Sequence, residues 1–127
     1  MLVVTDPLDG VFTQDIDDDT ELVRGGAGGK PFSEGTGVTT NPDGTLDGVS
    51  SAGEKGSSTE ETTKKGRIRH GKIRTTTVGE IKELGGEVIP DGGSDGNHCT
   101  INGCTEEQLG EAFGEPQPNP NHNGGLE

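Results

Sequence analysis

The sequence contains no tryptophan or tyrosine and only three phenylalanines among its 127 residues. A core must therefore be built mainly from aliphatic side chains, yet hydrophobic residues make up only 24% of the chain, against about 45–50% in typical globular domains. A membrane-spanning helix needs about 20 apolar residues, and no apolar run in this sequence approaches that length. We also expect no secretory signal, since no basic segment leads an apolar stretch. These absences exclude a helical membrane protein and predict one small domain with tails.

Basic residues are also scarce, and they are unevenly placed. Acids outnumber bases 23 to 10, giving a net charge of −13, which excludes a generally basic nucleic-acid binder. Between residues 64 and 74 lies a basic segment without any acid, which holds His70 and the cations Lys64, Lys65, Arg67, Arg69, Lys72 and Arg74. Lysine and arginine neutralise phosphate oxygens, so this basic segment predicts a phosphate-binding strand. The alternative is a solvated loop whose charge balances the acidic remainder.

The two cysteines, Cys99 and Cys104, are too few for a zinc site, even with His98 adjacent. A nucleophilic pair of Cys99 and His98 is excluded because neighbours on a strand point to opposite faces. We expect two reduced thiols, with Cys99 in the core. The cluster Asp17–Asp19 lacks the spacing of a calcium-binding loop, so residues 1–21 are predicted to be an acidic leader or linker. No metal and no cofactor are expected.

Capping patterns predict the helices. Thr77 with Glu80, and Thr105 with Gln108, have the spacing of capping boxes, in which side chain and backbone at a helix start bond reciprocally. Apolar side chains follow each pair at helical spacing. The expected helices are residues 78–84 and 106–113, with a third, short helix at 59–64 that has no apolar face.

Turn residues and apolar alternation predict the strands. The Asn41–Gly44 segment is a strong turn signal that should join two strands of a hairpin, and Pro90 should end another strand. The expected strands lie near residues 22–24, 45–50, 72–75, 87–89 and 98–101. The expected core consists of Leu22, Val38, Leu46, Val49, Ile73, Val78, Ile81, Leu84, Val88, Ile89, Ile101, Leu109 and Phe113.

Together these elements predict an α+β domain over residues 22–114, with short helices packed on a small, mostly antiparallel sheet. Residues 115–127 should form an irregular tail, whose last two residues, Leu126 and Glu127, are typical of an expression-vector scar.

Three groups of residues are candidates for a functional site. The first is the basic segment, and the second is Thr75–Thr77, whose hydroxyls and free N–H groups at a helix start favour an anion. The third is the strand in which His98 and Thr100 share one face. An imidazole beside a hydroxyl and opposite cations suits acid–base cleavage of a phosphodiester. The alternative for His98 is an ordinary, partly exposed strand histidine.

Short motifs rich in glycine, threonine and asparagine follow one another along the chain. They are LVRGG at 22–26, FSEGTGV at 32–38, NPDGTLDGVS at 41–50, TTTVGEI at 75–81, GGEVIP at 85–90, NHCTINGCTEEQL at 97–109 and PNPN at 118–121. Over about residues 22–121 this series resembles small C-terminal toxin domains of bacterial polymorphic secreted effectors, of the Rhs and contact-dependent inhibition kind. The resemblance implies a compact domain that is most often a nuclease, frequently a metal-independent ribonuclease of the barnase, EndoU or colicin type.

Carried over residue by residue, the resemblance implies that His98 is the general acid/base and that Arg24 binds phosphate. Thr76 and Thr100 would orient the substrate. The predicted phosphate-binding residues are Lys72, Arg74, Arg69 and His70. The chain departs from the family pattern in its two cysteines, which stand where small or aliphatic residues are expected. Its negative charge, which opposes a polyanion, is a second departure.

The resemblance also implies partners and a location. RNA is the expected substrate, and a cognate immunity protein or another protein is the expected partner, with no membrane involved. The protein would act in the cytoplasm of the producing or the target bacterium, where it arrives as part of a larger secreted effector.

Two alternative functions stay open. One is a non-enzymatic acidic module, immunity-like or a nucleic-acid mimic, that binds a basic partner; the acid-rich first half favours it. The other is an NAD-dependent ADP-ribosyltransferase toxin using Arg24, Thr75–Thr77 and Glu106 or Glu107. Against it, the chain has no tyrosine or tryptophan to stack nicotinamide and no Glu-x-Glu or Gln-x-Glu pair on a strand.

Overall fold

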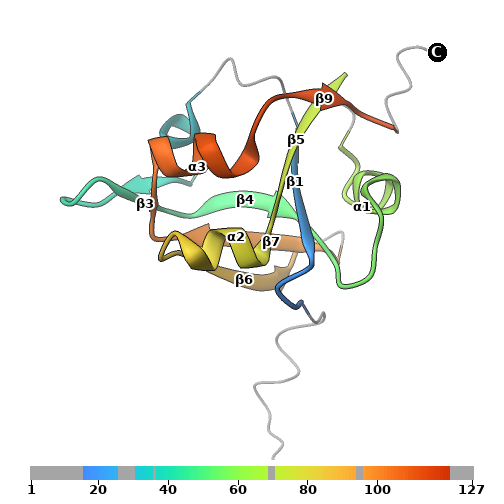
Figure 1. Ribbon diagram of the computed structural model, residues 1–127, viewed down its shortest axis with the longest axis horizontal. Coiled ribbons are helices and arrows are strands. Elements are labelled where there is room, and N and C mark those ends of the chain that lie inside the picture. The colour runs from blue at the N-terminus through green and yellow to red at the C-terminus, as the bar shows by residue number, and fades with distance from the viewer. Residues whose placement is uncertain (1–15, 26–30, 36, 69–70, 94–95, 121–127) are drawn as a thin grey trace, which may run out of the picture.

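The computed structural model describes residues 16–25, 31–35, 37–68, 71–93 and 96–120 (Figure 1). Most of the predicted acidic leader, the predicted site residues Arg69 and His70, and the terminal Leu126 and Glu127 lie outside this part. The helices are α1 (Thr59–Lys65), α2 (Val78–Glu83) and α3 (Glu106–Phe113), with a 3₁₀ turn η3 (Phe32–Glu34). The strands are β1 (Glu21–Gly25), β2 (Thr39–Thr40), β3 (Thr45–Asp47), β4 (Val49–Ala52), β5 (Lys72–Thr77), β6 (Glu87–Gly92), β7 (His98–Asn102), β8 (Cys104–Thr105) and β9 (Gln117–Pro118).

The described strands form two antiparallel sheets, which confirms the predicted α+β class. A six-stranded sheet has the order β6-β7-β4-β1-β5-β9, and a three-stranded sheet has the order β2-β3-β8. The single strand predicted at 45–50 is wrong, because the chain turns at Gly48 and enters a different sheet on each side. Gly48 has φ of +89°, and a Cβ there would lie 2.6 Å from the Gly37 carbonyl oxygen, so only glycine fits this turn.

The capping patterns place the helices as predicted. Complete capping boxes start α3, between Thr105 and Gln108, and α1, at Ser58. Only half of the predicted box at α2 forms. Thr77 accepts a hydrogen bond from the Glu80 amide, but the Glu80 carboxylate instead accepts one from the Thr76 hydroxyl, at 2.6 Å.

The prediction that Pro90 ends its strand is wrong, since β6 runs through it to Gly92. Strand β6 is the edge of its sheet, and an edge strand tolerates a residue that lacks an N–H donor. Its pairing with β7 shifts register between Ile89 and Gly92, which is the irregularity of a β-bulge. Strand β9 also lies in the segment predicted to be irregular, and it pairs with β5.

The main core lies between the six-stranded sheet, α2 and α3. Most of the predicted core is buried, namely Leu22, Leu46, Val49, Ile73, Val78, Ile81, Ile101, Leu109 and Phe113. Val38, Leu84 and Val88 are partly buried against this core, whereas Ile89 is half-buried and outside it. The prediction missed Val23, Phe32, Ala52 and Cys104, all of which are buried.

Helix α1 stands apart from α2 and α3 (Figure 1). It contacts β1, and a Cβ added at Gly66, just after the helix, would lie 3.3 Å from the Ala52 Cβ. Ala52 and its partner Val23 are buried but are not members of the main core cluster. Among the described helices, none has the length and apolar character to cross a membrane.

Candidate functional site

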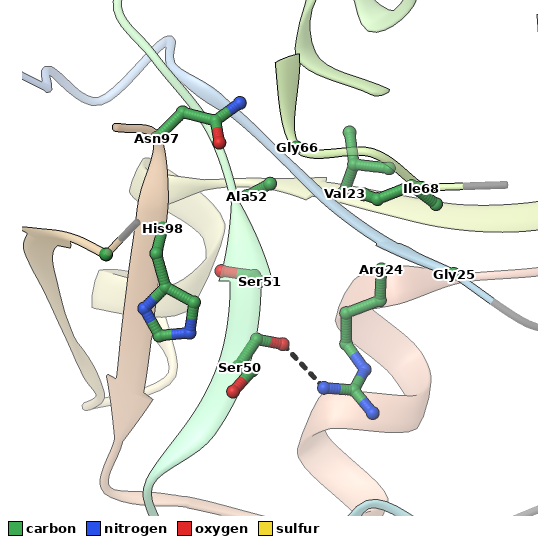
Figure 2. Close-up of a pocket in the computed structure, with 11 residues that line it drawn as sticks. Val23, Arg24, Gly25, Ser50, Ser51, Ala52, Gly66, Ile68, Asn97 and His98 are labelled. Atoms are coloured by element: carbon green, nitrogen blue, oxygen red, sulfur yellow. Dashed lines mark hydrogen bonds between the residues drawn. The ribbon is translucent and has the colours of Figure 1, made fainter. Parts of the chain in front are cut away.

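A pocket opens where the two central strands of the larger sheet diverge. Strands β1 and β4 pair at one position, Val23 with Ala52, and run apart beyond it (Figure 2). The opening, which we call the notch, has a volume of about 300 Å³. Val23, Ala52 and Ile68 give it an apolar floor, while Arg24, Ser50 and His98 supply polar groups. A concave, mostly apolar space with a few convergent polar groups is typical of a ligand site.

Arg24 crosses this opening. Its Nη1 donates a hydrogen bond of 2.5 Å to the Ser50 carbonyl oxygen on the other strand. Its guanidinium carbon lies 4.9 Å from the centre of the Phe32 ring, and that of Arg74 lies 5.3 Å from the same ring. Burial lowers the pKa of Arg24, and the charge of Arg74 lowers it further, while Glu106 acts in the opposite direction. Arginine nevertheless stays protonated in proteins, so the notch contains a cation that is costly to bury.

No ion pair among the described residues involves Arg24. A half-buried guanidinium that forms no ion pair is stabilised by an anion that enters the notch. The planar N–H fork of arginine matches the oxygens of a phosphate in particular. The notch is therefore a candidate phosphate site.

His98 lies at the opposite wall of the notch, and its ring is hydrogen-bonded to Asp91. The His98 Nδ1 lies 2.6 Å from the Asp91 Oδ1, and the Thr100 hydroxyl donates to the Asp91 Oδ2, also at 2.6 Å. With Nδ1 engaged by Asp91, the edge of the ring that carries Nε2 turns toward Ser50 (Figure 2). A carboxylate that fixes one imidazole nitrogen leaves the other as the acid–base group.

The register shift in β6 places Asp91. Gly92 pairs with His98 and Ile89 pairs with Thr100, so Asp91 lies in the irregular stretch between these pairs. Burial raises the pKa of Asp91, but hydrogen bonds from Thr100 and His98 and the charge of His98 lower it by more in sum. The carboxylate is thus ionised over a wider range of pH than an ordinary aspartate. Asp91 was not among the residues predicted from the sequence, although its position directly after an edge-strand proline is a signal for a bulge.

Two further residues fix the walls of the notch. Gly93 has φ of +60°, and a Cβ there would lie 2.8 Å from the Cβ of His98, so glycine allows the backbone to lie against the histidine. Asn97 is buried, and its side-chain amide donates to the Thr62 carbonyl oxygen of α1. The backbone carbonyl of Asn97 accepts a hydrogen bond from Gly53, so α1 and β4 are both tied to the start of β7.

The structure brings together some of the predicted site residues and separates others. Arg24 and His98 line the notch, and Thr100 reaches it through Asp91. Thr76 does not line it, since its hydroxyl donates to Glu80 in α2. Arg74 donates to the carbonyl oxygens of Gly110 and Gly114 at the end of α3, where a cation offsets the negative end of the helix dipole.

Two described residues of the basic segment border the notch. Gly66 and Ile68 line the pocket, and Lys72 is exposed at the start of β5. Arg69 and His70 fall outside the described residues, so their predicted roles stay predictions.

The two cysteines do not line the notch. Cys99 and Cys104 form no disulfide and are buried, and the Cys99 thiol donates to the Gly53 carbonyl at 3.6 Å. Burial raises the pKa of the Cys104 thiol. In the part of the chain that the structure describes, no three His, Cys, Asp or Glu residues are grouped so as to hold a metal ion.

Comparison with known proteins finds no family model, no curated protein and no solved structure that matches the chain. The function is therefore argued from the notch itself.

Proposed function

We propose that the notch binds a phosphate-bearing nucleotide unit and that His98 performs acid–base chemistry on it, with cleavage of an RNA phosphodiester as the reaction. The observation that carries this proposal is the placement of the Asp91-bound His98 in the same opening as the half-buried cation of Arg24. A positioned imidazole supplies the proton transfers of phosphodiester cleavage, and a guanidinium stabilises the charge that develops on the phosphate oxygens.

The step can be written from these groups alone. The Nε2 of neutral His98 takes the proton of a ribose 2′-hydroxyl, and that oxygen attacks phosphorus. The bond from phosphorus to the 5′-oxygen breaks, and the leaving oxygen takes up the proton from the His98 imidazolium, which returns to its neutral form. The products are a 2′,3′-cyclic phosphate and a free 5′-hydroxyl. Arg24 binds the non-bridging oxygens, while Asp91 holds His98 in place through its Nδ1.

Charge near the notch supports a polyanionic substrate despite the net charge of −13. Arg24 lines the notch, and Gly66 and Ile68 of the basic segment line it too, so Arg67 between them belongs to the border of the opening. Electrostatic attraction acts over about 10 Å at 0.1 M salt, so nearby charges outweigh distant ones.

The test is incubation of the purified chain with total tRNA and rRNA, with and without EDTA, read on a denaturing gel. We expect EDTA-resistant cleavage that leaves cyclic phosphate ends, and its loss in His98→Ala and Arg24→Ala with the fold intact by circular dichroism. Lys82→Ala is the matched control, because it removes a cation that pairs with Asp18, outside the notch lining. Cleavage that persists in folded His98→Ala removes His98 from the mechanism.

A second candidate is transfer of ADP-ribose from NAD. The lining of the notch favours it, because Arg24, the Ser50 hydroxyl and an apolar floor offer contacts for the phosphate, ribose and ring of a dinucleotide. In that reaction the bond between ribose C1′ and nicotinamide breaks, an acceptor hydroxyl bonds to C1′, and His98 takes the acceptor's proton. Release of nicotinamide from NAD, with and without bacterial lysate as acceptor, measures it. Glu106, considered for this role in the sequence, instead accepts hydrogen bonds from the Phe32 and Ser33 amides.

If RNA and NAD both stay intact at high protein concentration, the enzyme proposal fails. The acidic interaction module then becomes the better account, and capture of a basic protein partner is its test.

A further inference from the structure

One residue beside the notch has an unusual backbone. Arg67 has φ of +58° and is the only residue other than glycine with positive φ in the part of the chain that the structure describes. This left-handed region brings the Cβ of an L-residue too close to the backbone, and glycine avoids the penalty. In the same described part, glycine occupies ten other positions of positive φ, so Arg67 is the exception among these positions.

The position of Arg67 is one where glycine is preferred in proteins generally. Helix α1 ends at Lys65, and the chain leaves it through hydrogen bonds from the Arg67 amide to Lys64 and from the Ile68 amide to Thr63. These bonds resemble the Schellman ending, in which the left-handed residue after the helix is most often glycine. The fold therefore requires the left-handed backbone conformation at residue 67, which glycine would adopt without the penalty.

The neighbours of Arg67 connect it to the notch. Gly66 and Ile68, on either side of it, both line the pocket that contains Arg24 and His98. Arg67 itself is exposed. A strained residue beside a pocket is a reason to look for a role in function, since unfavourable conformations persist mainly where function retains them.

We propose that Arg67 is a second phosphate-binding residue at the rim of the notch, so that the substrate carries two phosphate groups, one at Arg24 and one at Arg67. The inference rests on the proposed nucleotide site and narrows its substrate class. Successive phosphodiesters of RNA and the pyrophosphate of a dinucleotide both meet the requirement, whereas a nucleoside monophosphate does not. Arg67 belongs to the basic segment that the sequence predicts to bind phosphate, but it is not among the residues named individually for that role.

The test compares binding of ADP and AMP by isothermal titration calorimetry without added metal, in the wild type and in Arg67→Gly. The wild type should bind ADP about tenfold more tightly than AMP, because the second phosphate gains a charge-assisted contact. Arg67→Gly should abolish this preference, leave AMP binding unchanged, and keep or raise the melting temperature, because glycine relieves the strained backbone. Arg67→Lys should recover part of the preference.

Lys64→Ala is the matched control, because Lys64 is an exposed cation of the same segment and its loss changes the net charge equally. An equal loss of preference in Lys64→Ala would mean that general charge, not Arg67, is responsible. If Arg67→Gly retains the preference for ADP, or if the wild type shows none, Arg67 does not have the proposed role. AMP binding that depends on Arg24 would still support the proposed nucleotide site in that case. Failure of the wild type to bind either nucleotide would overturn both.

Discussion

Helices α1 and α3 start with the same kind of capping box but are held in the fold by different forces. Helix α3 buries Leu109 and Phe113, and the Phe113 ring stacks on Phe32 with centroids 5.6 Å apart. Helix α1 buries only Thr62 and Thr63 and has no apolar face. Its contacts are hydrogen bonds and an ion pair, including Asn97 to Thr62 and Lys65 to Glu54.

The difference separates the part of the molecule that supplies stability from the part that forms the site. Apolar burial beneath α3 is insensitive to small shifts, whereas the hydrogen bonds of α1 are directional and fix the position of the chain that follows it. That chain lines the notch at Gly66 and Ile68. We therefore expect α1 and the chain that follows it, which lines the notch, to be locally less stable than α3 and the core beneath it.

Removing the Phe113 ring should have the largest effect on stability. Phe113→Ala opens a cavity under α3 and is expected to lower the free energy of unfolding by about 3–5 kcal/mol. Urea denaturation followed by circular dichroism measures this loss. A loss below about 1 kcal/mol would show that α3 does not carry the main core.

Removing the hydrogen bond between Asn97, just before β7, and α1 should lower the free energy of unfolding by less. Asn97→Ala removes the side-chain amide that donates to the Thr62 carbonyl, which keeps only its bond from the Gly66 amide, and is expected to lower the free energy of unfolding by about 1–3 kcal/mol. Amide hydrogen exchange should accelerate in α1 more than in α3. Equal acceleration in both helices would mean that α1 is part of the main cooperative core.

The two capping boxes allow a matched pair of variants. Ser58→Ala and Thr105→Ala each remove a cap worth about 1 kcal/mol. We expect Thr105→Ala to lower the global free energy of unfolding by that amount, because α3 is part of the core. Ser58→Ala should change it less and should act mainly on hydrogen exchange within α1. The reverse order would contradict the comparison.

The smallest effect concerns pH. The folded pKa of Asp91 lies below its ordinary value, so the ionised carboxylate stabilises the fold above the unfolded pKa of about 3.9. This contribution is lost as pH falls through the lower, folded pKa. The difference in unfolding free energy between the wild type and Asp91→Asn should therefore shrink below about pH 3.9. A difference that is constant with pH would exclude the ionised carboxylate as its source.

Local signals made much of the fold predictable from the sequence. Helix α3 was found because its cap and its apolar residues agree, and the Asn41–Gly44 hairpin was found from its turn residues. The two-sheet arrangement was missed because it depends on a single close approach of Gly48 to Gly37. Phe32 was missed because an isolated apolar residue in a glycine-rich stretch gives no periodic signal.

The site was predicted in part for the same reason. His98 and Arg24 were chosen for their chemistry, but their meeting in one notch depends on β1 and β4 diverging beyond Val23. Asp91 was missed because its place is set by an irregular register between β6 and β7. Such features arise from pairing between distant segments, which sequence patterns do not encode.

The central claim, that the notch is the ligand site, is tested most directly by titrating the ¹⁵N-labelled chain with AMP and following its amide signals by NMR. We predict shifts at Gly25, Ser51, Gly66, Gly93 and His98, which line the notch, and none in α3. The shifts should disappear in Arg24→Ala. Saturable shifts confined to α2 and α3, or no shifts at millimolar AMP, would contradict the account.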